Sequence, residues 1–156
     1  MSAVQEWLKS NRTFHIMRDH PSHNGKNFSC QIYQSKYFVF LGYILAGLWG
    51  TKLDKNRREM VKNLAVNMLN SAPRNYWDFD QALLRRIVWP EAVKDSVQHD
   101  SYSCNYAKFN SFHSTKPFPT RRKNKLYVGW SPAKTNQTGI RPCPKQCRMD
   151  TSWIFC

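Results

Sequence analysis

Five chemically reactive side chains fall within nine residues near the start of the chain: His15, Arg18, Asp19, His20 and His23. Imidazole nitrogens and carboxylate oxygens are good ligands for divalent metals. Pro21 disfavours a helical conformation at His20, so the last two histidines lie in a loop and helical spacing does not place them on one ion. Two interpretations stay open: a polar rim of a ligand site at the end of a strand, or ordinary loop residues in which Arg18 and Asp19 pair locally.

A second group of carboxylates stands in the middle of the chain, where Asp78 and Asp80 are two residues apart. Such a pair can hold Mg²⁺ or Mn²⁺ against a nucleotide diphosphate when it ends a buried strand. Here it opens a helix, so a helix cap with favourable dipole charge is one interpretation. The other is that Asp80 and Gln81 present polar groups to a ligand. His99, which follows a short predicted strand, is either a metal ligand or a structural histidine.

The charge balance favours an anionic partner. Twenty-four Lys and Arg residues against ten Asp and Glu residues give a net charge of +14. Nucleic acid, a phosphorylated small molecule or an acidic glycan would each fit. The basic run at 116–123 is either a solvated surface or a phosphate clamp. A non-enzymatic module for nucleic acid or acidic glycans would bind through these basic and aromatic side chains: Arg121, Arg122, Lys123, Lys125, Tyr127 and Trp130.

The cysteines and glycosylation sequons bear on the cellular compartment. Five cysteines are present, three of them in the last fourteen residues, and none forms a CxxC pair. A secreted protein would tie this tail by disulfides, whereas a cytosolic one would keep free thiols. Sequons at Asn11, Asn27 and Asn136 favour a lumenal protein. The polar start of the chain predicts no signal peptide, and the apolar run at 37–49 is too short for a membrane span.

Periodicity predicts an α/β layer with three main helices, a few short strands and an irregular Cys/Pro-rich tail. A capping box at 2–5 starts a helix that stops near 10–11, with Val4, Trp7 and Leu8 on one face. Strands are predicted at 13–18, 43–49, 96–99 and 126–128. Helices are predicted at 55–70 and from Asp78 to the residue before Pro90. Their apolar positions are Met60, Val61, Leu64, Ala65, Met68 and Leu69 in the first, and Leu83, Leu84, Ile87 and Val88 in the second.

Several strings, in this order, carry a resemblance to a known family: FHIMRDHPSH at 14–23, ILAGLWG at 44–50, DQALL at 80–84, WP at 89–90, HDSY at 99–102 and PFP at 117–119. Their order resembles the C-terminal part of a little-characterised group of GT-A-type glycosyltransferase-like proteins. The resemblance implies an acceptor-side part of a GT-A-like domain at 1–130. The irregular, basic, Cys-rich tail at 131–156 lies outside the resemblance.

The resemblance also implies an activity, which is hexosyl transfer from a nucleotide sugar to a glycan or other hydroxyl acceptor. Asp80 would be the catalytic residue, and His99 would be a metal or diphosphate contact. Substrate would be bound by Arg18, Asp19, His20, His23, Gly47, Trp49 and Gln81. The family enzyme uses Mn²⁺ or Mg²⁺ on a DxD motif that lies upstream of a segment like this one. We therefore expect a fragment that is inactive alone, and a complete protein of the Golgi or endoplasmic reticulum.

One segment departs from the family pattern. Twenty residues separate His23 from Ile44, many more than the family has there. Removing residues 26–42 restores family-like spacing, and the ends of this segment can encode splice signals. Two interpretations stay open: a retained intron, or a genuine lineage-specific loop.

Overall fold

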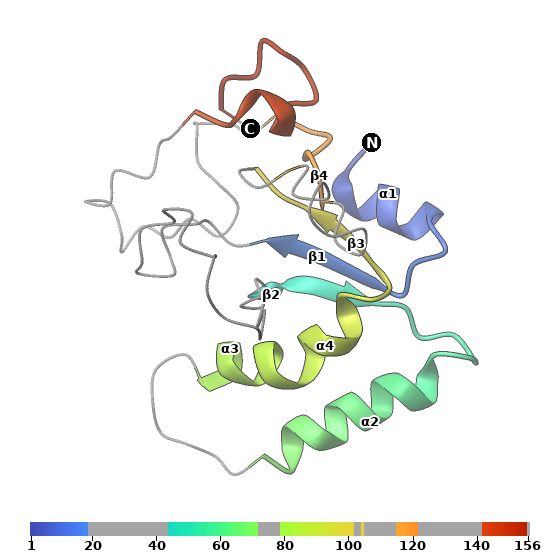
Figure 1. Cartoon of the computed structure of the whole chain (residues 1–156). Helices are drawn as coiled ribbons and strands as arrows, with labels where there is room; N and C mark the ends of the chain where they lie inside the picture. The colour runs from blue at the N-terminus through green and yellow to red at the C-terminus, as the bar shows by residue number, and fades with distance from the viewer. Residues whose placement is uncertain (19–43, 72–78, 102–103, 105–114, 122–141, 156) are drawn as a thin grey trace.

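A four-stranded mixed sheet forms the centre of the molecule (Figure 1). The computed structural model describes residues 1–18, 44–71, 79–101, 104, 115–121 and 142–155. The strand order is β2-β1-β3-β4, with β1 antiparallel to β2 and parallel to β3, and with β3 parallel to β4. The strands are β1 (Phe14–Arg18), β2 (Ile44–Thr51), β3 (Ser96–His99) and β4 (Thr115–Lys116). The carboxyl ends of three parallel strands therefore share one edge of the sheet.

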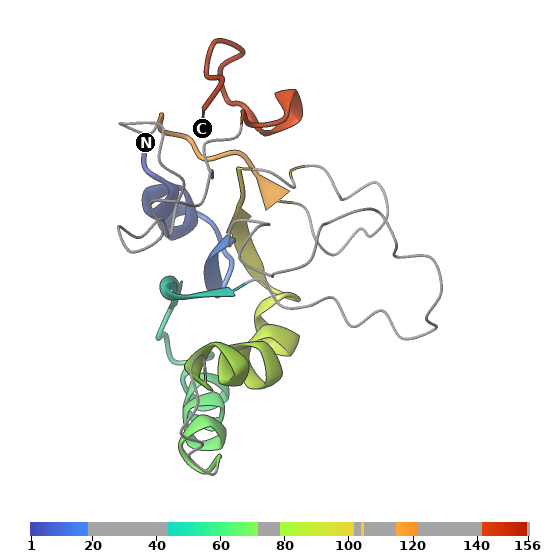
Figure 2. The ribbon, with the colours of Figure 1, turned by 90° about the vertical axis from the view of Figure 1, so that its left-hand side faces the viewer.

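Helices cover both faces of this sheet (Figures 1 and 2). The helix α1 (Ala3–Lys9) lies on one face and begins with the predicted capping box between Ser2 and Gln5. The other helical elements pack on the opposite face, where the main apolar core forms. They are α2 (Arg58–Leu69), α3 (Phe79–Leu83), the π-helical turn η2 (Leu84–Val88) and α4 (Trp89–Ala92). The α/β prediction is therefore confirmed for the described residues.

The alternation in β1 explains how the two layers attach to it. Phe14 and Ile16 are almost fully buried in the core beneath the α2–α4 layer. His15 lies on the other face and stacks on Trp7 of α1, with ring centroids 5.6 Å apart. The alternation of apolar and polar residues at 13–18 predicts a half-buried strand. That prediction is wrong for the first three residues of β1, which are buried on both sides because α1 covers the second face.

The helix at 79–92 continues past Pro90, so the prediction that it ends before this proline is wrong. Proline has no N–H and its ring clashes with the carbonyl four residues earlier in a regular helix. The chain avoids this conflict with a five-residue π-helical turn just before α4. Trp89 donates its N–H to the carbonyl of Leu84, one residue further back than in an α-helix.

The apolar face predicted for α2 is only partly buried. Leu64 is buried, and Met60 and Met68 pack against the core, but Ala65 and Leu69 are exposed. The same is true of α1, where Trp7 is buried but Val4 and Leu8 are exposed. A thin layer offers each helix a narrow contact, so only one stripe of apolar side chains is covered.

The strand β2 is longer than predicted, because it runs through Gly50 to Thr51. Gly50 pairs with His15, and a Cβ at this position would lie 3.3 Å from the Trp7 ring. Glycine therefore allows Trp7 to sit directly on the sheet. Further along β2, four residues at 45–48 stand opposite Met17 alone, which makes a large bulge that contains Gly47 at φ 80°.

The C-terminal tail is tied down by the disulfide Cys104–Cys147. Its described part, residues 142–155, is irregular apart from the short 3₁₀ turn Lys145–Cys147, and lies on the β4 side of the sheet (Figures 1 and 2). The disulfide-tied tail expected for a secreted protein is present.

None of the helices in the described ranges has the length and apolar character needed to cross a bilayer. The predicted strand at 126–128 and the segment 26–42 lie outside the described residues.

Candidate functional site

A buried ion pair marks the carboxyl edge of the sheet. The Arg18 guanidinium, at the end of β1, lies 3.5 Å from the Asp100 carboxylate, which follows β3. Their side chains are 9% and 4% exposed. Arg18 also lies over the Trp89 ring, 5.9 Å from its centroid. The parallel pairing of β1 with β3 brings these two charges together, since their carboxyl ends are neighbours.

The start of α3 adds polar groups to the same edge. Gln81 donates its side-chain amide to the carbonyl of Ile44, the first residue of β2. Ile44 is in turn the partner of Arg18 across the antiparallel ladder. Asp80, next to Gln81, is exposed in the first turn of α3. The structure therefore brings together three of the predicted site residues, Arg18, Asp80 and Gln81, at the edge where open α/β sheets bind ligands.

The two predicted β2 residues have different surroundings. Gly47 lies in the exposed bulge, with no other atom within 4 Å of the place where a Cβ would stand. A ligand can approach the backbone closely at such a position. The Trp49 side chain is half-buried and packs against the core, and its backbone pairs with Ile16. Trp49 therefore has a packing role in this fold.

A chain of four titratable side chains lies on the opposite face, beneath α1. His15 Nε2 is 3.0 Å from His99 Nδ1, and His99 Nε2 is 3.2 Å from Glu6 Oε2. The other oxygen of Glu6 accepts from Lys116 Nζ at 2.6 Å. An ionised carboxylate only accepts hydrogen bonds. His99 therefore carries its proton on Nε2 and accepts at Nδ1 from the Nε2–H of His15.

Burial keeps both imidazoles neutral near pH 7. It lowers the pKa of His15 to about 4, with a further contribution from the nearby His99. Burial also lowers the pKa of His99, although the hydrogen bond to Glu6 opposes this effect. The pKa of Glu6 is lowered chiefly by the hydrogen bond from Lys116. Among these four side chains, only Glu6 and Lys116 are thus charged at neutral pH, and their charges neutralise each other.

The residues described here do not fit a divalent metal site. Within the described ranges, no three side chains of the His, Cys, Asp and Glu types gather around a common point. His99, the expected metal contact, has both ring nitrogens within hydrogen-bond distance of protein partners. Its ring is thus held between His15 and Glu6 on the α1 face of the sheet. We therefore derive no chemical step through a metal.

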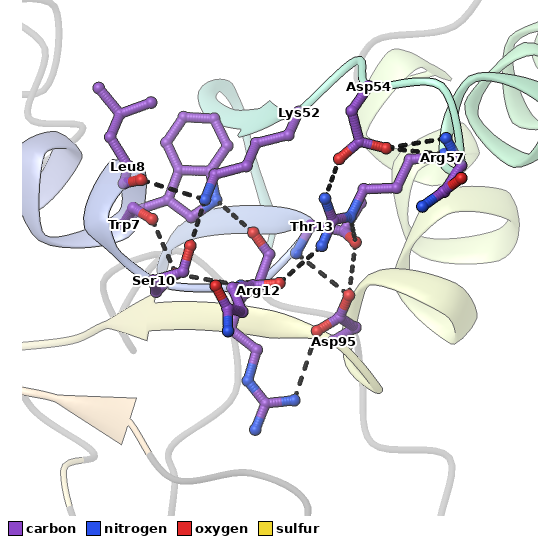
Figure 3. Close-up of polar contacts among 11 residues, drawn as sticks. Trp7, Leu8, Ser10, Arg12, Thr13, Lys52, Asp54, Arg57 and Asp95 are labelled. Carbon is purple, nitrogen blue, oxygen red and sulfur yellow. Dashed lines mark hydrogen bonds and ion pairs between the residues drawn. The ribbon is translucent and has the colours of Figure 1, made fainter.

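The amino edge of the sheet is occupied by contacts within the chain (Figure 3). Asp95 accepts from the N–H and the hydroxyl of Thr13, and Arg57 donates its Nε–H to the same hydroxyl at 2.6 Å. Lys52 donates to the carbonyls of Leu8 and Ser10, which the end of α1 leaves without helical partners. These charged groups are engaged in contacts within the fold. The carboxyl edge, by contrast, also presents the exposed Asp80 and the accessible backbone at Gly47, so it is the better candidate for ligand binding.

Several predicted residues fall outside the described ranges, so their placement gives no test. They are Asp19, His20, His23, Asp78, Lys123, Lys125, Tyr127 and Trp130, together with Arg122. Lys116, the first residue of the predicted phosphate clamp, is instead paired with Glu6. Arg121 is exposed.

The hydrogen-bonded series from His15 through His99 to Glu6 was missed in the sequence, because its members are far apart along the chain and nothing local signals the pairing of β1 with β3.

No protein-family model, curated protein or solved structure matches this chain.

Proposed function

We propose that this chain is the acceptor-side part of a GT-A-type glycosyltransferase-like protein, which binds a hydroxyl-bearing sugar at the carboxyl edge of its sheet. The observation that supports this proposal best is the buried ion pair between Arg18 and Asp100 at that edge. Burying two charges costs desolvation energy that their attraction often fails to recover. Such a pair therefore adds little to the folding stability. Its presence is explained if it fixes polar groups in place at a binding edge.

The polar groups at this edge have separable roles in the proposal. Gln81 holds the start of β2 against α3 through the Ile44 carbonyl. That bond fixes the first turn of α3, where the exposed Asp80 carboxylate accepts a hydroxyl proton from the acceptor. The bulge at Gly47 leaves backbone accessible to a sugar ring. The nucleotide sugar would need the DxD part that the resemblance places upstream.

Binding of the full chain to an array of neutral hexose oligosaccharides tests this proposal. We expect a subset of these glycans to bind, and we expect Asp80→Asn to weaken that binding at least about tenfold, because the amide is a poorer hydroxyl acceptor than a carboxylate. Glu59→Gln is the matched control, since Glu59 is also an exposed first-turn carboxylate, on α2. Absence of glycan binding by the folded wild-type chain, or equal binding by both variants, would contradict the proposal.

A further inference from the structure

The turn between α1 and β1 presents Asn11, the first residue of the Asn11-Arg12-Thr13 sequon. Asn11 is exposed, and no side chain or backbone group of the described residues hydrogen-bonds to its side-chain amide. Its backbone is nevertheless held, because the Asn11 carbonyl accepts from Arg57 Nη2 at 2.7 Å. An exposed amide on an anchored turn can carry a bulky group without disturbing the packing below it.

The third residue of the sequon has the opposite environment. Thr13 is only 2% exposed. Its hydroxyl accepts a hydrogen bond from Arg57 Nε and donates one to the Asp95 carboxylate (Figure 3). Because Asp95 is the residue before β3, the second bond ties the start of β1 to the start of β3. The glycosylation motif requires a hydroxyl at this position. An enzyme that reads the motif must therefore reach Thr13 before these contacts close.

The disulfide gives an independent indication of the compartment. Cys104 and Cys147 are bonded across 43 residues, and Cys143 is also disulfide-bonded. Structural disulfides form and persist in oxidising environments such as the lumen of the endoplasmic reticulum. Asparagine-linked glycans are added to proteins of the same secretory route, so the fold carries two features of one compartment.

We propose that Asn11 carries an asparagine-linked glycan and that the glycan is attached before the sheet closes. In this step the Asn11 amide nitrogen bonds to the anomeric carbon of a lipid-pyrophosphate-linked oligosaccharide. The bond from that carbon to the pyrophosphate oxygen breaks, the lipid pyrophosphate leaves, and the amide loses one proton to a base of the transferase.

The position of the glycan is compatible with the proposed site. Asn11 precedes β1, and Arg18 is the last residue of that strand, so the two lie at opposite ends of it. The glycan would extend from the amino edge, where Arg12, Thr13, Arg57 and Asp95 already satisfy one another. The carboxyl edge would stay open.

Translation of the full chain behind a cleavable secretory signal, in the presence of microsomes, tests attachment. Asn27→Gln and Asn136→Gln leave Asn11 as the single sequon. We expect one mass increment that peptide N-glycosidase removes, and we expect Asn11→Gln to abolish it. Thr13→Ser, which keeps the hydroxyl, should retain it. Signal cleavage without any increment on the single-sequon chain would overturn the proposal.

A second experiment tests whether the glycan is attached before the chain folds. It uses the purified unmodified chain, a solubilised oligosaccharyltransferase and its lipid-linked donor. We expect modification of the reduced, unfolded single-sequon chain and of a peptide spanning residues 7–17, with at least about tenfold less on the folded chain. Equal rates for folded and unfolded chain would overturn attachment before folding. Modification of the peptide but not of the unfolded chain would overturn the site itself.

Discussion

Replacing His15 by Gln should remove a large part of the acid sensitivity of folding. Burial lowers the pKa of His15 from its ordinary value of 6.5 to about 4. The unfolded chain therefore takes up the proton first as the pH falls, and stability rises with pH between these two values. A shift of about 2.5 units corresponds to about 3 kcal/mol in total, of which about 2 kcal/mol is lost between pH 7.5 and pH 5.

Urea unfolding of the wild type and of His15→Gln at pH 7.5 and pH 5.0 measures this difference. The glutamine amide can still donate to His99 Nδ1, so the variant removes the titration and keeps a donor. His99 contributes in the same direction, since its pKa is also lowered. The carboxyls of Glu6 and Asp95 also have lowered pKa values. The folding stability that they contribute is lost only when the pH falls below their ordinary pKa values of 4.5 and 3.8, outside the interval measured.

Between pH 7.5 and pH 5.0, we expect the free energy of unfolding to fall by about 2 kcal/mol more for the wild type than for His15→Gln. The control is Asn67→Gln, on the exposed side of α2 and far from the histidines in sequence, which should behave as the wild type does. Equal losses in the wild type and in His15→Gln would refute the account of a buried neutral imidazole.

Three further predictions concern folding. Gly50→Ala should cost about 1–3 kcal/mol, because its Cβ would press on the Trp7 ring, and the urea midpoint should fall accordingly. Replacing Cys104 and Cys147 together by Ala should cost about 2–4 kcal/mol, seen as a lower melting temperature; a melting temperature equal to that of the oxidised wild type would contradict a stabilising bridge. Asp95→Asn should cost about 1–3 kcal/mol, because it weakens two bonds to Thr13, whereas Asp150→Asn on the exposed tail should change stability by less than about 0.5 kcal/mol.

Local signals predicted α1, β1 and α2, but not the short strand β4. The capping box at 2–5, the alternation around Phe14 and Ile16, and the apolar period around Leu64 each depend on neighbours in the sequence. The passage of the helix through Pro90 was mispredicted, because a π-helical turn before α4 accommodates the proline that would otherwise end a regular helix. The exposed Leu69 follows from the narrow contact of α2, which periodicity does not measure.

The candidate site could be predicted only in part. Arg18, Asp80 and Gln81 were recognised as polar groups at the ends of elements, and the strand register brings them to one edge. The partnership of Arg18 with Asp100 depends on which strand lies beside β1, which the sequence pattern leaves open. The burial of His99 depends on α1 covering the sheet, so its metal-contact interpretation could not be weighed from the sequence.

Mapping of ligand contacts by nuclear magnetic resonance tests the central claim most directly. The isotope-labelled full chain would be titrated with the hexose oligosaccharide that binds best on the array. We predict that the largest backbone shift changes occur at Arg18, Asp80, Gln81 and Asp100, while Thr13 and Asp95 at the other edge change little. Changes centred on Thr13 and Asp95, with the carboxyl edge unaffected, would contradict the account.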